Sequence, residues 1–154
     1  MSKYIDTRDL YKRQQELQSL KDAVDSAQEE LDQLTTSKPD EDEGLKALEK
    51  WQAEVDQAEA DNRRALEDFG DDEQTELAEL DEIEGYVSDW KHGETMIPED
   101  SFEDYARELA DDLGSIPKDA GWPCTCIDWK KAANELKYDY STVTYQGTDY
   151  LVRS

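Results

Sequence analysis

The sequence is poor in cysteine and histidine and contains no long apolar run. Its two cysteines, Cys124 and Cys126, are two positions apart, which is too close for an ordinary structural disulfide and supplies no metal framework by itself. No segment approaches the roughly 18 consecutive apolar residues that indicate a transmembrane helix. Residues 1–6 do not begin the basic and apolar pattern of a secretory signal. We therefore expect a reduced protein in the cytoplasm.

The residue patterns of enzymes and cofactor sites are also missing. His92 is the only histidine and stands in a polar turn beside Gly93, so we expect a structural or merely exposed side chain rather than half of a Cys–His pair. Walker and dinucleotide-binding motifs are absent. Residues 40–44 depart from a calcium-binding loop because their glycine is misplaced and Trp51 occupies the twelfth position. We predict a protein without enzymatic activity, catalytic residues, cofactor or metal.

Basic residues are scarce. Lysine and arginine total 17 against 41 aspartates and glutamates, which gives a formal net charge of −24. Residues 40–84 hold nineteen acidic and four basic residues, whereas eight acidic and six basic residues precede them and fourteen acidic and seven basic residues follow. Such a chain repels phosphates, so it should bind basic surfaces rather than nucleic acid or anionic membranes. A solubilising charge excess, salt adaptation and a disordered acidic segment are plainer explanations, but salt adaptation would spread the acidic residues evenly.

A periodic apolar pattern marks the first helix. The helix should begin at Asp6 or Thr7 and end before Pro39, which disfavours helix at Lys38. Its apolar residues recur at alternating steps of three and four after one longer step, which is typical of a coiled-coil seam. Pairing of this helix with a second copy would use the same seam. The predicted oligomerisation residues are Leu10, Leu17, Leu20, Val24, Leu31 and Leu34.

Two more helices are predicted before residue 93. The second spans about residues 42–69, and because the connector is short, an antiparallel hairpin with the first helix is the economical arrangement. Asn62 would be a polar insertion that fixes its register. The third begins at Asp71 or Asp72 after Gly70, although one continuous bent helix is the alternative. Its apolar residues are Leu77, Leu80, Ile83, Val87 and Trp90.

The last third of the chain has a different character and most of the aromatic residues. A short strand at Met96 and Ile97 should precede a helix that begins after Pro98 and stops at Gly114. A second helix, capped by Asp128, and two β-rich runs at residues 140–145 and 148–153 follow. The fold class is thus mainly α: an antiparallel coiled-coil or helical hairpin with a third helix (residues 1–92), then a small α+β domain that ends in a β-hairpin (residues 93–154).

The last domain carries a family resemblance. An acidic helix, an Ile-Asp-aromatic start to a second helix and a final Gly-x-x-Tyr strand that ends in arginine make up the pattern, which lies in residues 96–114, 126–136, 139–140 and 147–153. It resembles the last domain of ArdA-type antirestriction proteins over about residues 94–154. The resemblance implies an acidic, often dimeric protein of a plasmid, transposon or phage that imitates bent B-DNA. Residues 1–93 do not resemble the first two domains of that family.

The acidic helices fit this expectation. As one helix, residues 40–84 would extend about 67 Å with a carboxylate roughly every 3.5 Å, and one strand of B-DNA carries a phosphate about every 3.4 Å. Carboxylates three or four positions apart on a helix have similar spacings. The carboxylates predicted to face the partner are Asp56, Glu59, Asp61, Asp71, Asp72, Glu73, Glu76, Glu79, Glu82, Glu108, Asp111 and Asp112.

The predicted function is therefore an acidic DNA-mimic inhibitor in the host cytoplasm. Its partner would be the basic DNA-binding groove of a defence enzyme, first a type I restriction-modification enzyme and next a CRISPR effector or another nucleic-acid-binding defence protein. Direct binding of nucleic acid or membrane is not expected, and homodimerisation stays open. The alternative is a coiled-coil structural or adaptor protein of a phage or mobile element. Whether the imitating surface lies in residues 40–84 or in the last domain is also open.

Overall fold

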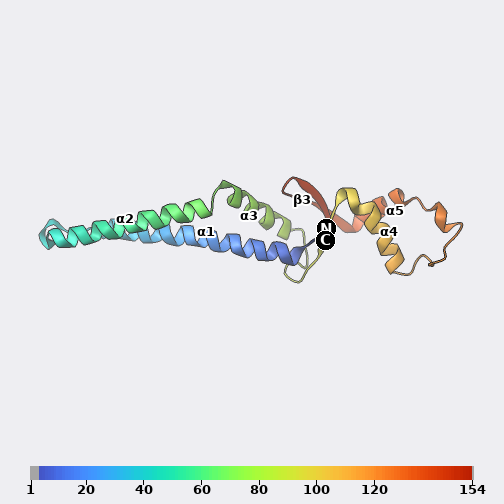
Figure 1. The fold of residues 1–154 in the computed structure, drawn as a ribbon, viewed down its shortest axis with the longest axis horizontal. Helices are drawn as coiled ribbons and strands as arrows, with labels where there is room; N and C mark the ends of the chain where they lie inside the picture. The colour runs from blue at the N-terminus through green and yellow to red at the C-terminus, as the bar shows by residue number, and fades with distance from the viewer. Residues whose placement is uncertain (1–3, 154) are drawn as a thin grey trace. The chain divides into compact units, whose positions relative to one another are not determined.

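The computed structural model describes residues 4–153, which form five α-helices and a small antiparallel sheet (Figure 1). Four short 3-10 turns join these elements. The prediction of a mainly helical chain with a small α+β region at its end is confirmed. The elements are β1 (Ile5–Asp6), α1 (Thr7–Thr36), α2 (Leu45–Asp68), α3 (Asp71–Glu84), β2 (Thr95–Pro98), α4 (Phe102–Asp112), α5 (Trp129–Leu136), β3 (Tyr140–Tyr145) and β4 (Thr148–Arg153).

The described residues form two compact units. The helical unit comprises Arg13–Leu77, and the sheet unit comprises the residues up to Lys12 together with those from Ala78 onward. Helices α1 and α3 each contribute residues to both units. The limits predicted from the sequence, residues 1–92 and 93–154, stay a prediction.

In the helical unit, α2 runs back along α1. The indole nitrogen of Trp51, near the start of α2, donates a 2.7 Å hydrogen bond to the carbonyl of Leu34, near the end of α1. Further along α2, Asn62 donates to the side chain of Gln28 at 3.2 Å. Later residues of α2 thus meet earlier residues of α1, and Figure 1 shows the two helices side by side. Asn62 is buried and hydrogen-bonded, as expected of a polar residue that fixes register.

The predicted seam of α1 is covered to different degrees within a single chain. Leu10 and Leu17 are buried. Leu20, Val24, Leu31 and Leu34 are half-buried. The pattern agrees with a helix that turns one face toward a neighbour, but a role of these residues in oligomerisation stays a prediction.

The helix boundaries near α3 differ from the sequence prediction at one end. Gly70 separates α2 from α3, as the glycine indicated, and Phe69 leaves the helical region at ψ 67°. However, α3 ends at Glu84, so the prediction that it carries Val87 and Trp90 is wrong. The N–H groups of Tyr86 and Val87 donate to carbonyls three residues earlier, which tightens the chain into turns after Gly85. Val87 and Trp90 are still buried.

The sheet has the strand order β1-β2-β4-β3, and all its neighbouring strands are antiparallel. Strands β3 and β4 form the predicted hairpin, in which Tyr145 pairs with Thr148. The two turn residues, Gln146 and Gly147, have φ of 48° and 80°. Positive φ at both positions is the geometry that two-residue hairpins favour, because its twist matches that of the strands. The hairpin prediction is confirmed.

Helices α4 and α5 pack with the sheet around a small core. Ile97 from β2 and Leu151 from β4 belong to one buried cluster with Phe102, Ala106 and Ala133. Tyr140 meets Phe102 edge-to-face, with ring centroids 5.1 Å apart. The predicted cap of α5 is confirmed, since Asp128 accepts a 3.1 Å hydrogen bond from the N–H of Lys131.

The segment before α1 joins the sheet, which the sequence did not indicate. Strand β1 pairs with β2, with Ile5 opposite Met96. Thr7 is fully buried. Its N–H donates to the carbonyl of Glu94 at 2.9 Å, and its hydroxyl accepts from the N–H of Glu94 at 2.7 Å. Residues 5–7 are thus fixed to residues 94–96.

Candidate acidic interaction surface

Helix α3 has more acidic residues than any other α-helix in the described part of the chain. Eight of its 14 residues are acidic and none is lysine or arginine. Asp71, Asp72 and Glu82 are exposed, whereas Glu73, Glu76 and Glu79 are half-buried. A three-residue step falls about 60° short of a full helical turn, so these glutamates wind about half-way round the helix. They therefore do not form a straight row.

Glu76 is held in an ion pair. The guanidinium of Arg13 donates to it from Nε at 3.1 Å and from Nη2 at 3.0 Å, and the Glu76 side chain is only 13% exposed. Arg13 also pairs with Glu16 at 3.3 Å. The hydrogen bond to Glu76 raises the pKa of Arg13 above its ordinary value. This geometry makes Glu76 a link between α3 and α1 within the helical unit.

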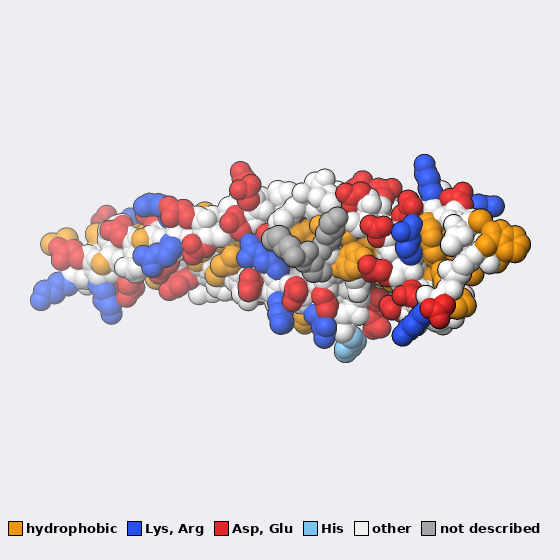
Figure 2. All heavy atoms as spheres, turned by 45° about the vertical axis from the view of Figure 1, so that its right-hand side comes forward, with side chains coloured by type: hydrophobic (Ala, Val, Ile, Leu, Met, Phe, Trp, Pro, Cys, Tyr) orange, Lys and Arg blue, Asp and Glu red, His pale blue; other side chains and the backbone are white. Residues whose placement is uncertain are grey.

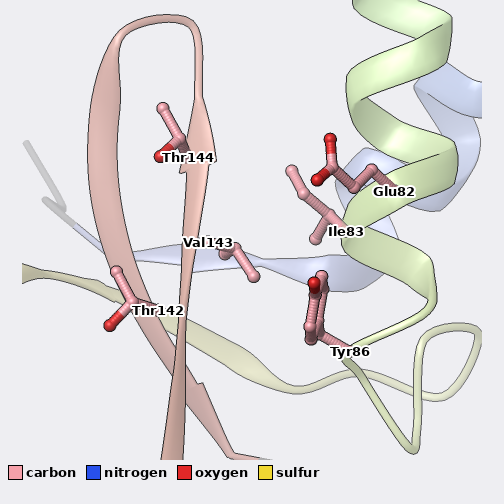
Figure 3. Close-up of a pocket in the computed structure, with 6 residues that line it drawn as sticks. All are labelled: Glu82, Ile83, Tyr86, Thr142, Val143 and Thr144. Carbon is pink, nitrogen blue, oxygen red and sulfur yellow. The ribbon is translucent and has the colours of Figure 1, made fainter.

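Glu79 and Glu82 lie beside the β-hairpin of the sheet unit. The N–H of Gln146 in the hairpin turn donates to Glu79 at 3.1 Å. Figure 3 shows Glu82, Ile83 and Tyr86 around a hollow whose other side is formed by β3. The hollow encloses ≈150 Å³, which is below the roughly 300 Å³ at which small-molecule sites begin. Glu79 therefore holds the hairpin turn, while the carboxylate of Glu82 stays exposed.

Glutamine side chains hold several carboxylates of the helical unit. On α2, Gln52 donates to Asp56 at 2.9 Å and Gln57 donates to Asp61 at 3.0 Å. Two pairs on α1 repeat this spacing: Gln18 donates to Asp22 and Gln28 to Asp32, at 3.0 and 2.9 Å. A neutral amide orients a carboxylate and leaves its charge in place. The sequence signal, glutamine four residues before aspartate, is present four times and could have indicated this arrangement.

Ion pairs engage few carboxylates in residues 4–153. Asp6, Glu16, Glu76 and Glu99 are among those that form them. Of the twelve carboxylates predicted to face a partner, Glu76 alone forms one within this part of the chain. Asp56, Glu59 and Asp61 are exposed on α2. Acidic side chains accordingly cover much of the surface in Figure 2, with lysines and arginines scattered among them.

The acidic residues of α4 lie beside a second hollow. Glu108 and Asp111 line it together with Trp129 of α5, and it encloses ≈380 Å³. The guanidinium of Arg107 stands over the Trp129 ring, 5.3 Å from its centroid. Tyr4 donates a long hydrogen bond of 3.5 Å to Glu108, and burial, followed by the charge of Glu108, raises the pKa of Tyr4. Asp112 is exposed on the same helix.

The structure thus divides the predicted carboxylates between the two units. The helical unit carries the exposed Asp56, Glu59, Asp61, Asp71 and Asp72 together with the half-buried Glu73. The sheet unit carries the exposed Glu82, Glu108, Asp111 and Asp112. Within residues 4–153, no three histidine, cysteine or acidic side chains are placed to hold a metal ion. What these surfaces offer chemically is dense negative charge on ordered helices.

No protein-family model, curated protein or solved structure matches the chain. The resemblance to ArdA-type proteins therefore rests on the motifs of residues 94–154 alone. Among the helices in the described part of the chain, none combines the length and the apolar character needed to cross a membrane.

Proposed function

We propose that this protein is an acidic DNA mimic, without enzymatic activity, that inhibits a host defence enzyme by occupying its DNA-binding site. A type I restriction-modification enzyme is the first candidate target, and a CRISPR effector is the next. The observation that carries the proposal is the state of the carboxylates on α2. Asp56 and Asp61 are exposed, and neutral glutamine amides hold them. An imitation of a phosphate backbone requires carboxylates that are held in place and keep their negative charge.

Charge alone would serve solubility equally well, so the scaffold matters. A flexible polyanion attracts basic proteins but has no defined shape, whereas carboxylates on packed helices keep their spacing. We further propose that α1 and α2 pack as an antiparallel coiled coil, in which the Trp51–Leu34 and Asn62–Gln28 hydrogen bonds fix the register. The coiled coil would hold the charges in place despite their mutual repulsion.

The carboxylates divide into two roles under this proposal. Exposed residues without ion pairs in the described chain, such as Asp56, Asp61 and Asp72, would meet the basic groove. Glu76 and Glu79 would instead support the fold, because Arg13 and the turn at Gln146 already occupy them. The binding energy would be distributed, so the loss of any one exposed charge should have a small effect.

The test is competition with DNA on a purified type I modification methyltransferase. The wild-type chain should displace a labelled duplex, and its affinity should fall as salt rises. A triple variant, Asp56→Asn, Asp61→Asn and Asp72→Asn, should bind more weakly. The matched control, Asp89→Asn, Glu135→Gln and Asp139→Asn, removes the same charge from exposed positions elsewhere. Equal losses in the two variants would mean that net charge, and not a placed surface, governs binding.

A structural or adaptor role is the second candidate. It is favoured by exposed leucines near the start of α2, where Leu45 is 71% exposed and Leu48 shares with it a hollow of ≈230 Å³. Leucines in such a position suit contact with another helix. An adaptor should retain its partner when excess DNA is added, whereas a DNA mimic should be displaced, so the same competition separates the two candidates.

A further inference from the structure

The segment between α4 and α5 exposes large apolar side chains. Trp122 is 84% exposed and Leu113 is 72% exposed. Hydrophobic side chains gather at the surface of the sheet unit where this segment lies (Figure 2). Single exposed apolar residues are ordinary. A large tryptophan and a leucine exposed on one irregular segment instead indicate a site of interaction with a partner. We call residues 113–128 the apolar loop.

The apolar loop lies over the hollow of ≈380 Å³ described above. Ile116 and Ala120 of the loop and Trp129 of α5 supply apolar walls, while Glu108 and Asp111 of α4 supply carboxylates. Trp122 stands between Ala120 and Cys124 in the chain, and both of these line the hollow. The volume is within the range of sites that take one side chain or a small molecule. In the chain, Trp122 is thus flanked by residues that line a cavity large enough to receive part of a partner, and so is Leu113, which lies between Asp111 and Ile116.

Charge around the loop selects the partner. Asp111 and Asp112 directly precede Leu113, and Asp119 lies three residues before Trp122; all three are exposed. Two cations oppose these charges: Lys118 in the loop, and Arg107, which lines the hollow and stands over the Trp129 ring. Together with Glu108 in the lining, the carboxylates outnumber them four to two. An apolar patch with an acidic rim is complementary to a basic surface that presents an apolar side chain, since interface centres exclude charge and interface rims carry it.

We propose that the apolar loop is a docking surface for a basic protein segment in which a large aliphatic side chain is flanked by lysine or arginine. The aliphatic side chain enters the hollow, Trp122 and Leu113 cover it, and Asp111, Asp112 and Asp119 meet the flanking cations. Tryptophan is enriched among the residues that contribute most of the binding energy at protein interfaces. This site goes beyond the proposed function, because its occupancy depends on apolar contact as well as on charge.

The experiment uses two synthetic peptides of equal charge. One carries two adjacent leucines between lysines, and its twin carries serines in their place. Binding to the full chain is followed by amide chemical shifts at physiological ionic strength. We expect the leucine peptide to bind at least about tenfold more tightly than the serine peptide and to shift the resonances of residues 107–129. Trp122→Ala should abolish the difference between the two peptides.

The matched control is Tyr138→Ala, which removes an aromatic side chain that is 90% exposed but lies outside the loop, and it should preserve the difference. Circular dichroism of both variants checks that the fold is intact. Equal affinity for the two peptides in the wild type would overturn the proposal and leave charge as the only attraction. So would self-association that Trp122→Ala abolishes, because a second copy would then be the occupant. None of these outcomes depends on whether the chain displaces DNA from a methyltransferase.

Discussion

Two glutamates of α3 should lose very different amounts of stability on the same substitution. Glu76 is 13% exposed and receives two hydrogen bonds from Arg13, at 3.1 and 3.0 Å, whereas Glu82 is exposed. Hydrogen bonds to charged groups contribute about 1.5–3 kcal/mol when buried. Because the Arg13 side chain is 40% exposed, solvent screens the pair, and we expect Glu76→Gln to lower the free energy of unfolding by about 1–2 kcal/mol.

Glu82→Gln removes the same charge from the same helix, and surface substitutions of this kind stay within about 0.5 kcal/mol of neutral. Urea denaturation followed by far-UV circular dichroism, at low and at high ionic strength, measures both changes. Most of the loss in Glu76→Gln should remain at high salt, because the Glu76 side chain is only 13% exposed even though solvent reaches Arg13. Equal stabilities of the two variants, or a larger loss in Glu82→Gln, would refute the assignment of Glu76 to the fold.

Three further predictions concern other contacts. Replacing Gln52 and Gln57 by methionine keeps the net charge but releases the carboxylates that they hold, so the stability of α2 should fall by about 0.2–0.5 kcal/mol per pair. Displacement of DNA from a methyltransferase, measured by fluorescence anisotropy, should then need several-fold more protein. Gly93→Ala should lower the urea midpoint by the equivalent of about 1–3 kcal/mol, because φ is +107° and a Cβ would lie 2.9 Å from the Arg8 Nε. Burial and a hydrogen bond raise the pKa of Tyr140, so the protonated form is favoured in the folded state. The contribution of Tyr140 to stability should be full below about pH 10, the ordinary tyrosine pKa, and should fall above it. Tyr140→Phe should flatten that alkaline decline in a pH series of thermal melts.

Elements with a strong local signal were predictable from the sequence. The period of leucines and alanines gives α1 and α2 to within a few residues of their ends, and Gly147 with its β-rich flanks gives the hairpin of β3 and β4. The cap of α5 follows from Asp128 alone, because a side-chain oxygen at that position satisfies a free N–H of the first turn. Each of these choices is made by residues close together in the chain.

Features that depend on distant residues were not predictable. Strand β1 exists because Ile5 and Asp6 pair with Met96 and Thr95, and two residues carry no periodicity that could reveal it. Arg13 and Glu76 are 63 positions apart in the chain. Sequence spacing alone therefore predicts that Glu76 is an exposed charge like its neighbours on α3. The i,i+4 glutamine–aspartate pairs are the exception, since their signal is local and repeated.

The strand order has a consequence for how the chain folds as it is made. Strand β4 is the last of the described strands to be synthesised. It also lies between β2 and β3 and pairs with both of them. Arg13–Leu77 form a separate unit whose contacts are complete once Leu77 has been made. Because domains fold as units during synthesis, we expect the helical unit to fold first. Ile5 and Asp6 can pair only after Met96 and Thr95 have been made, about ninety residues later. A nascent chain stalled before residue 148 would therefore combine ordered carboxylates in one unit with an incomplete sheet in the other.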